Sequence, residues 1–236
     1  MRYLLTLSIV ISAALVSCGD SVKTKKNNES HKAELDSALF SGISATRNLE
    51  FEKAQKILIE LIEDAEATGS EYHIITGYIN LGNLYNYYSL YDQALENLFI
   101  ALEKSDEFGM DEHKNAILNN IGIVYAKNGS SEKACEYFAQ ALKRSRIDAD
   151  SNRVALNLIN LSSALSERNL NDSALNCLEE GLILFDKDKQ STNYVATLNN
   201  IGNIHFSEGN IDSALSYYSK SYQRRSKDVD PWLQSE

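Results

Sequence analysis

The amino-acid sequence repeats itself every 40 residues, and this regularity limits the chain to a repeat architecture. An alanine recurs at this interval five times, at Ala54, Ala94, Ala134, Ala174 and Ala214. Three further columns keep the same register: Gly42, Gly82, Gly122 and Gly202; Asn80, Asn120, Asn160 and Asn200; and Leu81, Ile121, Leu161 and Ile201. Several independent columns in one register indicate structural units that bury their apolar faces against their neighbours. The sequence therefore predicts a solenoid.

The apolar residues inside each period are spaced as in α-helices. In the second period one helical face, with spacing i, i+3, i+4 and i+7, consists of Tyr78, Leu81, Gly82 and Tyr85. A second face of this kind consists of Ala94, Leu98, Ala101 and Leu102. The segment between them, Ser89-Leu90-Tyr91-Asp92, is expected to form a short turn. Each unit is thus expected to be a pair of antiparallel helices.

This pattern resembles the tetratricopeptide repeat, whose first helix carries an apolar residue, Leu-Gly and Tyr, and whose second carries Ala, an aromatic residue and Ala. In the third period the matching residues are Leu118, Ile121, Gly122, Tyr125, Ala134, Phe138 and Ala141. The resemblance covers about residues 31–226 and implies an all-α, right-handed solenoid of about five antiparallel helix-turn-helix repeats. The expected units are 31–70, 71–110, 111–150, 151–190 and 191–226. The fourth unit departs from the pattern at Ser162 and Gly181.

The composition agrees with a helical protein and disfavours several other classes. One proline and 11 glycines in 236 residues disfavour loop-rich all-β folds and low-complexity disorder. Three cysteines are too few for a disulfide scaffold. The 33 acidic residues outnumber the 23 basic ones, and the formal net charge of −10 argues against nucleic acid as a partner.

The N-terminal residues are typical of an export signal. Arg2 supplies a positive charge, and residues 4–16 form an apolar run that would rise only about 20 Å as a helix, against a hydrocarbon core of roughly 30 Å. The run ends Leu15-Val16-Ser17-Cys18-Gly19, which resembles the lipobox of bacterial lipoproteins. This resemblance implies cleavage before Cys18, diacylglycerol on its thiol and acylation of the new amine. The alternative is an ordinary signal with a chance cysteine.

We therefore expect residues 1–17 to be a lipoprotein signal peptide and residues 18–30 to be a flexible tether. Gly19, next to Cys18, favours the outer membrane of a Gram-negative bacterium, with periplasmic and external orientations both open.

At the other end, Asp230-Pro231 is typical of a helix start, so residues 227–236 are expected to begin a further or capping helix. Either the chain is truncated after Glu236 or its last apolar face packs against a partner.

The reactive side chains match no catalytic or metal-binding pattern. The sequence contains no phosphate-binding Gly-rich loop, no His-Glu-x-x-His motif and no Cys-x-x-Cys motif. His73 and His113 occupy equivalent places in successive units, but a third metal ligand is missing, and solvated side chains are expected. Cys135 and Cys177 are expected to be free buried thiols, with a disulfide between adjacent units as the alternative.

Asp148 and Asp150 imitate the start of a calcium-binding loop. The sixth and twelfth positions of such a loop hold Arg153 and Ile159 instead of glycine and glutamate. The two aspartates are therefore expected to cap the following helix. The sequence predicts no enzyme, no metal and no cofactor.

A row of asparagines is the candidate for partner binding. It consists of Asn80, Asn120, Asn160 and Asn200, flanked by Asn83, Asn203 and Tyr87 on the same side of the first helix. The resemblance implies that this side lines a concave groove and holds the backbone of an extended peptide. An amide both donates and accepts hydrogen bonds, and asparagine costs a helix roughly 0.5–0.7 kcal/mol relative to alanine, so the row needs a reason. The alternative reason is structural, with the row bonding neighbouring helices.

The expected function is that of a membrane-anchored adaptor or scaffold in the bacterial cell envelope. Its partner would be a protein or an extended peptide in the groove, and it would reach the membrane through its lipid anchor. The alternative is the sensor or regulatory portion of a longer signalling protein, with a kinase or DNA-binding output outside this chain.

Overall fold

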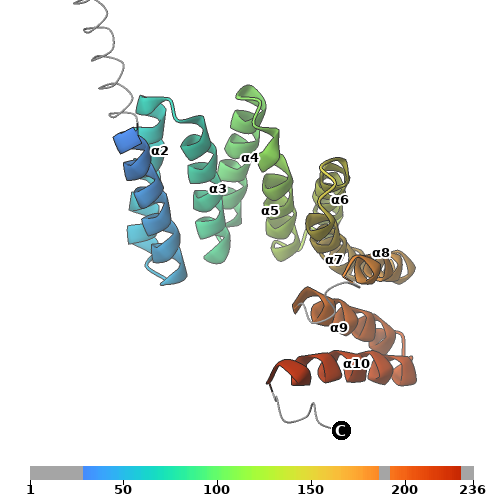
Figure 1. Cartoon of the computed structure of the whole chain (residues 1–236). Helices are drawn as coiled ribbons and strands as arrows, with labels where there is room; N and C mark the ends of the chain where they lie inside the picture. The colour runs from blue at the N-terminus through green and yellow to red at the C-terminus, as the bar shows by residue number, and fades with distance from the viewer. Residues whose placement is uncertain (1–28, 186–191, 230–236) are drawn as a thin grey trace, which may run out of the picture. The chain divides into compact units, whose positions relative to one another are not determined.

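The computed structural model describes residues 29–185 and 192–229, and every regular element in these ranges is helical. A first helix covers residues 29–47. It is followed by α2 (Phe51–Thr68), α3 (Glu71–Tyr87), α4 (Tyr91–Glu107), the 3-10 turn η1 (Asp111–His113), α5 (Lys114–Lys127), α6 (Ser131–Ile147), α7 (Ser151–Glu167), α8 (Asn171–Leu184), α9 (Thr192–Ser207) and α10 (Ile211–Val229) (Figure 1). The expected all-α class with consecutive antiparallel helix pairs is confirmed, while the handedness stays a prediction.

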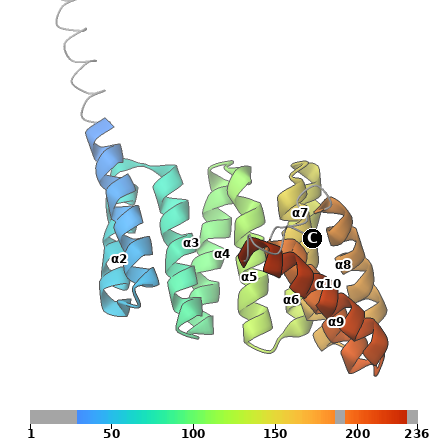
Figure 2. The same ribbon diagram turned by 60° about the horizontal axis from the view of Figure 1, so that its bottom comes forward.

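The described chain divides into two compact units. The first ends at Leu84 and contains the helix 29–47, α2 and most of α3, and the second begins at Tyr85. Within the second unit the helices pack mainly against their sequence neighbours: α5 against α6, α7 against α8, and α9 against α10 within pairs, and α6 against α7 and α8 against α9 between pairs (Figure 2). Such nearest-neighbour packing is what a repeat array requires.

The alanine column lies at the contacts between helices. Every one of its five side chains is at most 1% exposed, from Ala54 to Ala214. Their expected burial is confirmed. A small side chain is needed at this place because a larger one would hold the two helix backbones of a pair apart.

The glycine column matches a second column of large side chains, 16 residues later. Gly42 faces Leu58, whereas Gly122 faces the ring of Phe138 and Gly202 faces the ring of Tyr218. A Cβ atom added to Gly122 or Gly202 would lie 2.6 Å from the ring that it faces. Glycine is thus required here by close packing.

The fourth unit carries a different pair at this register. Ser162 replaces the glycine, whereas Leu178 is a leucine as in the first two units (Leu58 and Leu98), and both Ser162 and Leu178 are buried. The Ser162 hydroxyl donates to the carbonyl oxygen of Ile159 in its own helix, 2.7 Å away. Gly181, the other departure, lies within α8, and among the described residues no atom outside the nearby backbone of α8 lies within 4 Å of the place where a Cβ would stand.

Eight connections between helices in the described ranges contain one residue each in left-handed conformation, mostly at intervals of 20 residues. These residues are Leu49, Gly69, Ser89, Gly109, Gly129, Ala149, Asn169 and Gly209. The turn expected at residues 89–92 is shorter than predicted, because Tyr91 and Asp92 already belong to the first turn of α4. Asp92 favours helix there because a carboxylate is stabilised by the positive end of the helix dipole.

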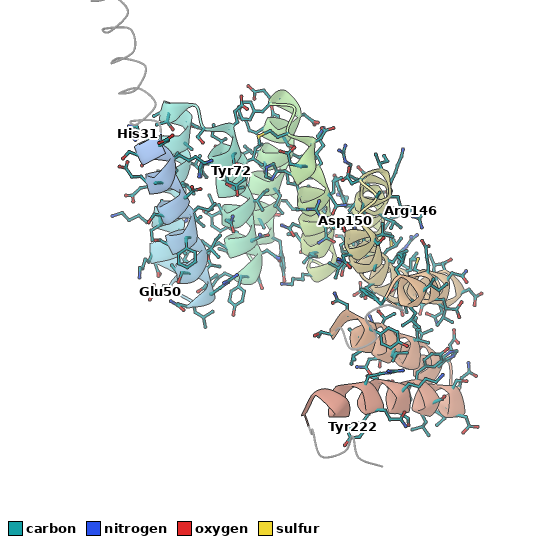
Figure 3. The ribbon with its side chains drawn as sticks, in the orientation of Figure 1. His31, Glu50, Tyr72, Arg146, Asp150 and Tyr222 are labelled. Atoms are coloured by element: carbon teal, nitrogen blue, oxygen red, sulfur yellow. The ribbon has the colours of Figure 1, made fainter. Side chains whose placement is uncertain are left out.

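The two aspartates that imitate a calcium loop play different roles. The expected capping is confirmed for Asp150, whose Oδ1 accepts from the backbone N–H of Arg153 at 3.0 Å, at the start of α7 (Figure 3). For Asp148 the expectation is wrong. Its Oδ1 accepts instead from Nε of Arg144, 3.1 Å away, because it follows that arginine by four residues at the end of α6.

His73 is not the solvated side chain that we expected. It is 0% exposed, with Nδ1 lying 2.8 Å from the hydroxyl oxygen of Ser70 and Nε2 donating to Oδ1 of Asp36 at 3.0 Å. The ring is buried because the start of α3 packs against the helix 29–47, which supplies Asp36. Hydrogen bonds to both ring nitrogens make this burial tolerable.

The membrane-related predictions lie mostly outside the described residues. Residues 1–17 and Cys18 lie outside the described residues, so the signal peptide and the lipid anchor stay predictions. The same holds for the further helix expected near the C-terminus, because residues 230–236 are also outside them. In the described part of the chain no helix combines the length and the apolar character that crossing a bilayer demands.

The two glycine environments predict opposite effects of the same substitution. Gly122→Ala drives a methyl group into the buried Phe138 ring and should destabilise the protein by about 1–3 kcal/mol. Gly181→Ala meets open space in a helix interior and should stabilise it by about 0.5–1 kcal/mol. Thermal and urea denaturation of the two variants beside the parent chain measure both changes. Shifts in the same direction for both variants would contradict the packing described here.

Candidate peptide-binding site

The predicted asparagine row occupies the first helix of successive pairs. Within the second unit, Asn120 lies on α5, Asn160 on α7 and Asn200 on α9, and all three are half-buried. The exposed Asn203 stands almost one turn after Asn200. Tyr87, at the end of α3, is 58% exposed, with its ring edge against Tyr88 at 5.4 Å between centroids.

Asn80 and Asn83 belong to α3 in the first unit and are half-buried. The Asn80 amide donates to the carbonyl oxygen of Thr76, 2.8 Å away in the same helix. This bond is local and leaves the Asn80 amide oxygen available. The assignment of both residues to partner binding stays a prediction.

One member of the row has a structural bond. Nδ2 of Asn160 donates to Oδ1 of Asn119 at 2.7 Å, which ties α7 to α5. By contrast, the side chains of Asn120 and Asn200 form no hydrogen bond with any residue that the structure describes. The row therefore combines one amide that joins neighbouring helices with two that are available to a ligand.

A hollow of about 250 Å³ lies beside the C-terminal end of the row. It is lined by α7, α8 and α9, through Ser162, Ser163, Ser166, Glu167, Leu178, Asn200, Asn203 and Ile204. Leu178 and Ile204 are buried and supply the apolar part of the lining. Asn200 and Asn203 come from α9, whereas the serines and Glu167 come from α7, so the two sets belong to the first helices of adjacent pairs (Figure 1).

The Asn203 amide is oriented by a tyrosine. The Tyr218 hydroxyl donates to Oδ1 of Asn203 at 2.8 Å, and the Tyr218 ring is seated against Gly202. Because Oδ1 accepts this bond, the amide NH₂ group remains as a double donor. The repeat's glycine–aromatic contact thus positions a side chain of the hollow.

The serines of α7 contribute acceptors. Ser162 and Ser163 both donate their hydroxyl hydrogens to the carbonyl oxygen of Ile159, at 2.7 Å and 3.2 Å. Ser162 is buried, but the oxygen lone pairs of the exposed Ser163 remain available. Together with the Asn203 donors they give the hollow both kinds of hydrogen-bonding group, which is the complement of a peptide backbone.

The Cys177 thiol is poorly suited to act as a nucleophile. Cys135 and Cys177 are both free, as expected, although Cys177 is only half-buried. Burial raises the pKa of the Cys177 thiol above its usual value, and the nearby carboxylate of Glu180 acts in the same direction. A raised pKa leaves little thiolate at neutral pH. No cluster of three or more His, Cys, Asp or Glu side chains suited to a metal occurs in the part of the chain that is described.

Sequence reasoning found Asn200 and Asn203 but missed the other side of the hollow. Ser163, Ser166 and Glu167 do not recur from one period to the next, so no column marks them. Asn119 could have been recognised from the sequence, because an asparagine recurs two periods later, at Asn199.

Two stretches of the chain match the sequence pattern of the tetratricopeptide repeat. They are residues 114–187 and residues 195–228. The chain thus carries tetratricopeptide repeats in these two stretches. The match includes α5 to α8 and most of α9 and α10, and therefore all the residues that line the hollow.

A curated relative covers a smaller part of the chain. Photosystem I assembly protein Ycf3 from Rippkaea orientalis is 40% identical over 52 residues, which are 22% of this chain and 28% of that protein. The chain therefore spans little more than a quarter of the relative that it matches.

Solved structures resemble much more of the fold. BtubC from P. vanneervenii superposes with a TM-score of 0.70 at 21% identity, over 84% of this chain and 92% of that one. A Rap protein complexed with competence and sporulation factor has a TM-score of 0.68 at 15% identity, over 82% of this chain and 54% of that one. At these identities the likeness concerns the fold.

The Asn119–Asn160 bond predicts a measurable coupling between α5 and α7. Asn119→Ala and Asn160→Ala each remove the 2.7 Å bond, so a double-mutant cycle should give a coupling energy of about 0.5–1.5 kcal/mol. Urea denaturation provides the four free energies of unfolding. The matched control pairs Asn160→Ala with Asn120→Ala, which should be additive because Asn120 bonds to no described side chain. Equal coupling in both cycles would contradict the bond.

Proposed function

We propose that this tetratricopeptide-repeat chain is a peptide-binding adaptor of the bacterial cell envelope, held at the membrane by a lipid on Cys18. The observation that carries the proposal is the hollow next to Asn200 and Asn203, where free donors and acceptors converge over an apolar base. The protein acts by binding and brings its partner to the membrane surface.

The binding step follows from the hydrogen-bonding groups of the hollow. An extended peptide offers alternating carbonyl oxygens and N–H groups, which are unpaired before binding. The Asn203 NH₂ group donates to a peptide carbonyl, while the serine oxygens of α7 accept from peptide N–H groups. Asn200 and Asn120, whose amides are free among the described residues, extend the same recognition along the helices.

The fold of the Rap protein that was solved with competence and sporulation factor supports this type of use. It shows that a helix array of this class accommodates a separate factor. The helix pairs of this chain are rigid, and a preformed groove would avoid much of the entropic cost of ordering the receptor on binding.

Photo-crosslinking in the source cells tests the peptide-binding role. p-Benzoylphenylalanine placed at Ser166, in the hollow, should capture a partner, whereas the same group at the exposed Asn176 of α8 should not. Adding Asn200→Ala and Asn203→Ala should reduce the Ser166 adduct at least several-fold with the melting temperature nearly unchanged. Mass spectrometry identifies the adduct. A crosslink from Ser166 that persists undiminished in the double variant would place the binding determinants elsewhere.

The anchor has a separate test. Cys18→Ala removes the proposed lipid attachment site, so the variant should leave the membrane fraction and lose the lipid mass that the parent chain carries. Two or more acyl chains give durable anchoring, and their loss should therefore change the distribution completely. The readouts are fractionation and intact-protein mass spectrometry. A variant that stays in the membrane fraction with an unchanged lipidated mass would overturn this part of the proposal.

A further inference from the structure

The hollow of the candidate site contains a single charge. Of the eight side chains that line it, only Glu167 is ionisable, and the others are serine, asparagine, leucine and isoleucine. Glu167 is exposed and forms no ion pair with any described residue. Its carboxylate is therefore available to a ligand that enters the hollow.

The position of Glu167 in its helix strengthens the negative potential. It is the last residue of α7, where the free backbone carbonyls give the helix end a partial negative charge. The neighbouring cation, Arg168, is directed to a different helix, with its NH2 atom 3.9 Å from Oε1 of Glu132 in α6. Hence the helix end and the carboxylate both favour a positive group in the hollow.

The polar groups around Glu167 fit a cationic side chain better than an anionic one. The exposed Ser163 donates to Ile159 and so presents oxygen lone pairs. Ammonium and guanidinium groups carry only donors and need such acceptors. An acidic side chain would meet these lone pairs and the Glu167 carboxylate, and both contacts are repulsive.

The size of the hollow limits the ligand. A volume of about 250 Å³ lies below the roughly 300–1,000 Å³ of ordinary small-molecule pockets. It suits one long side chain with a short stretch of backbone. Asn203, held by Tyr218, supplies the donors for a backbone carbonyl.

We infer that the hollow selects a peptide segment with a lysine or arginine side chain, whose cation pairs with Glu167 while Asn200 and Asn203 hold the adjoining backbone. This inference rests on the proposed peptide-binding function and names the ligand class for the same site. It also agrees with the formal net charge of −10 for the chain, which attracts basic partners over a longer range.

The test uses phage-displayed random 12-residue peptides as the probe. Selections are run on the immobilised full chain, on Glu167→Lys and on Glu179→Lys, an exposed residue of α8 that does not line the hollow. The two variants change the net charge equally, so long-range attraction is matched and only the charge inside the hollow differs. Melting temperatures verify that the variants are folded.

The parent chain should enrich lysine and arginine at one peptide position by about fivefold over the unselected library, the effect of one charge-assisted contact. Glu179→Lys should keep this preference, whereas Glu167→Lys should replace it by aspartate and glutamate. Measured affinities of a selected peptide should fall by a similar factor when its cationic residue is replaced by glutamine.

Three results would overturn the inference, each in a different way. Peptides enriched by the parent chain without a charge preference, and lost with Asn200→Ala and Asn203→Ala, leave the proposed function standing and remove the cation selectivity. If the parent chain enriches peptides no more than that double variant does, both the proposed function and the cation selectivity are overturned. A lysine and arginine preference that survives Glu167→Lys would assign the selectivity to another part of the chain.

Discussion

Close approach of the two helices in each pair is the constraint on which the rest of the structure depends. The fully buried alanine column and the glycines that face large side chains permit this approach. Where Gly122 and Gly202 meet rings, even one added methyl group would overlap an atom. The pairs are therefore rigid units, and because each touches mainly its neighbours, a local change in packing stays local.

The candidate site occurs where this regular packing is interrupted. At the register of Phe138 and Tyr218 the fourth unit carries the smaller Leu178, which lines the hollow. Its partner Ser162 brings a hydroxyl in place of a glycine hydrogen. On the other side the regular pair persists, and there Tyr218 orients Asn203. The departure from the glycine column thus adds a hydroxyl, and an intact repeat contact positions the amide that lines the hollow.

The predictability of particular residues follows from this arrangement. Asn200 and Ala174 were found because they recur every 40 residues, whereas Ser166 and Glu167 recur nowhere and were missed. His73 was misjudged for a related reason. Its burial depends on Asp36, a residue of another helix 37 positions earlier that no local pattern connects with it.

The sequence by itself determined the all-α class, the helix pairs and the positions of small residues at the contacts, because helical spacing and a fixed period are properties of the chain read along its length. Only the tertiary structure decided which amides are free and where a hollow opens. Asn160 and Asn200 are identical in type and register, yet Asn160 donates to Asn119 on a neighbouring helix, while Asn200 lines the hollow. The physical reason is that hydrogen-bond partners and empty volume are set by side chains brought together from different helices, including non-repeating residues such as Ser163 and Ser166.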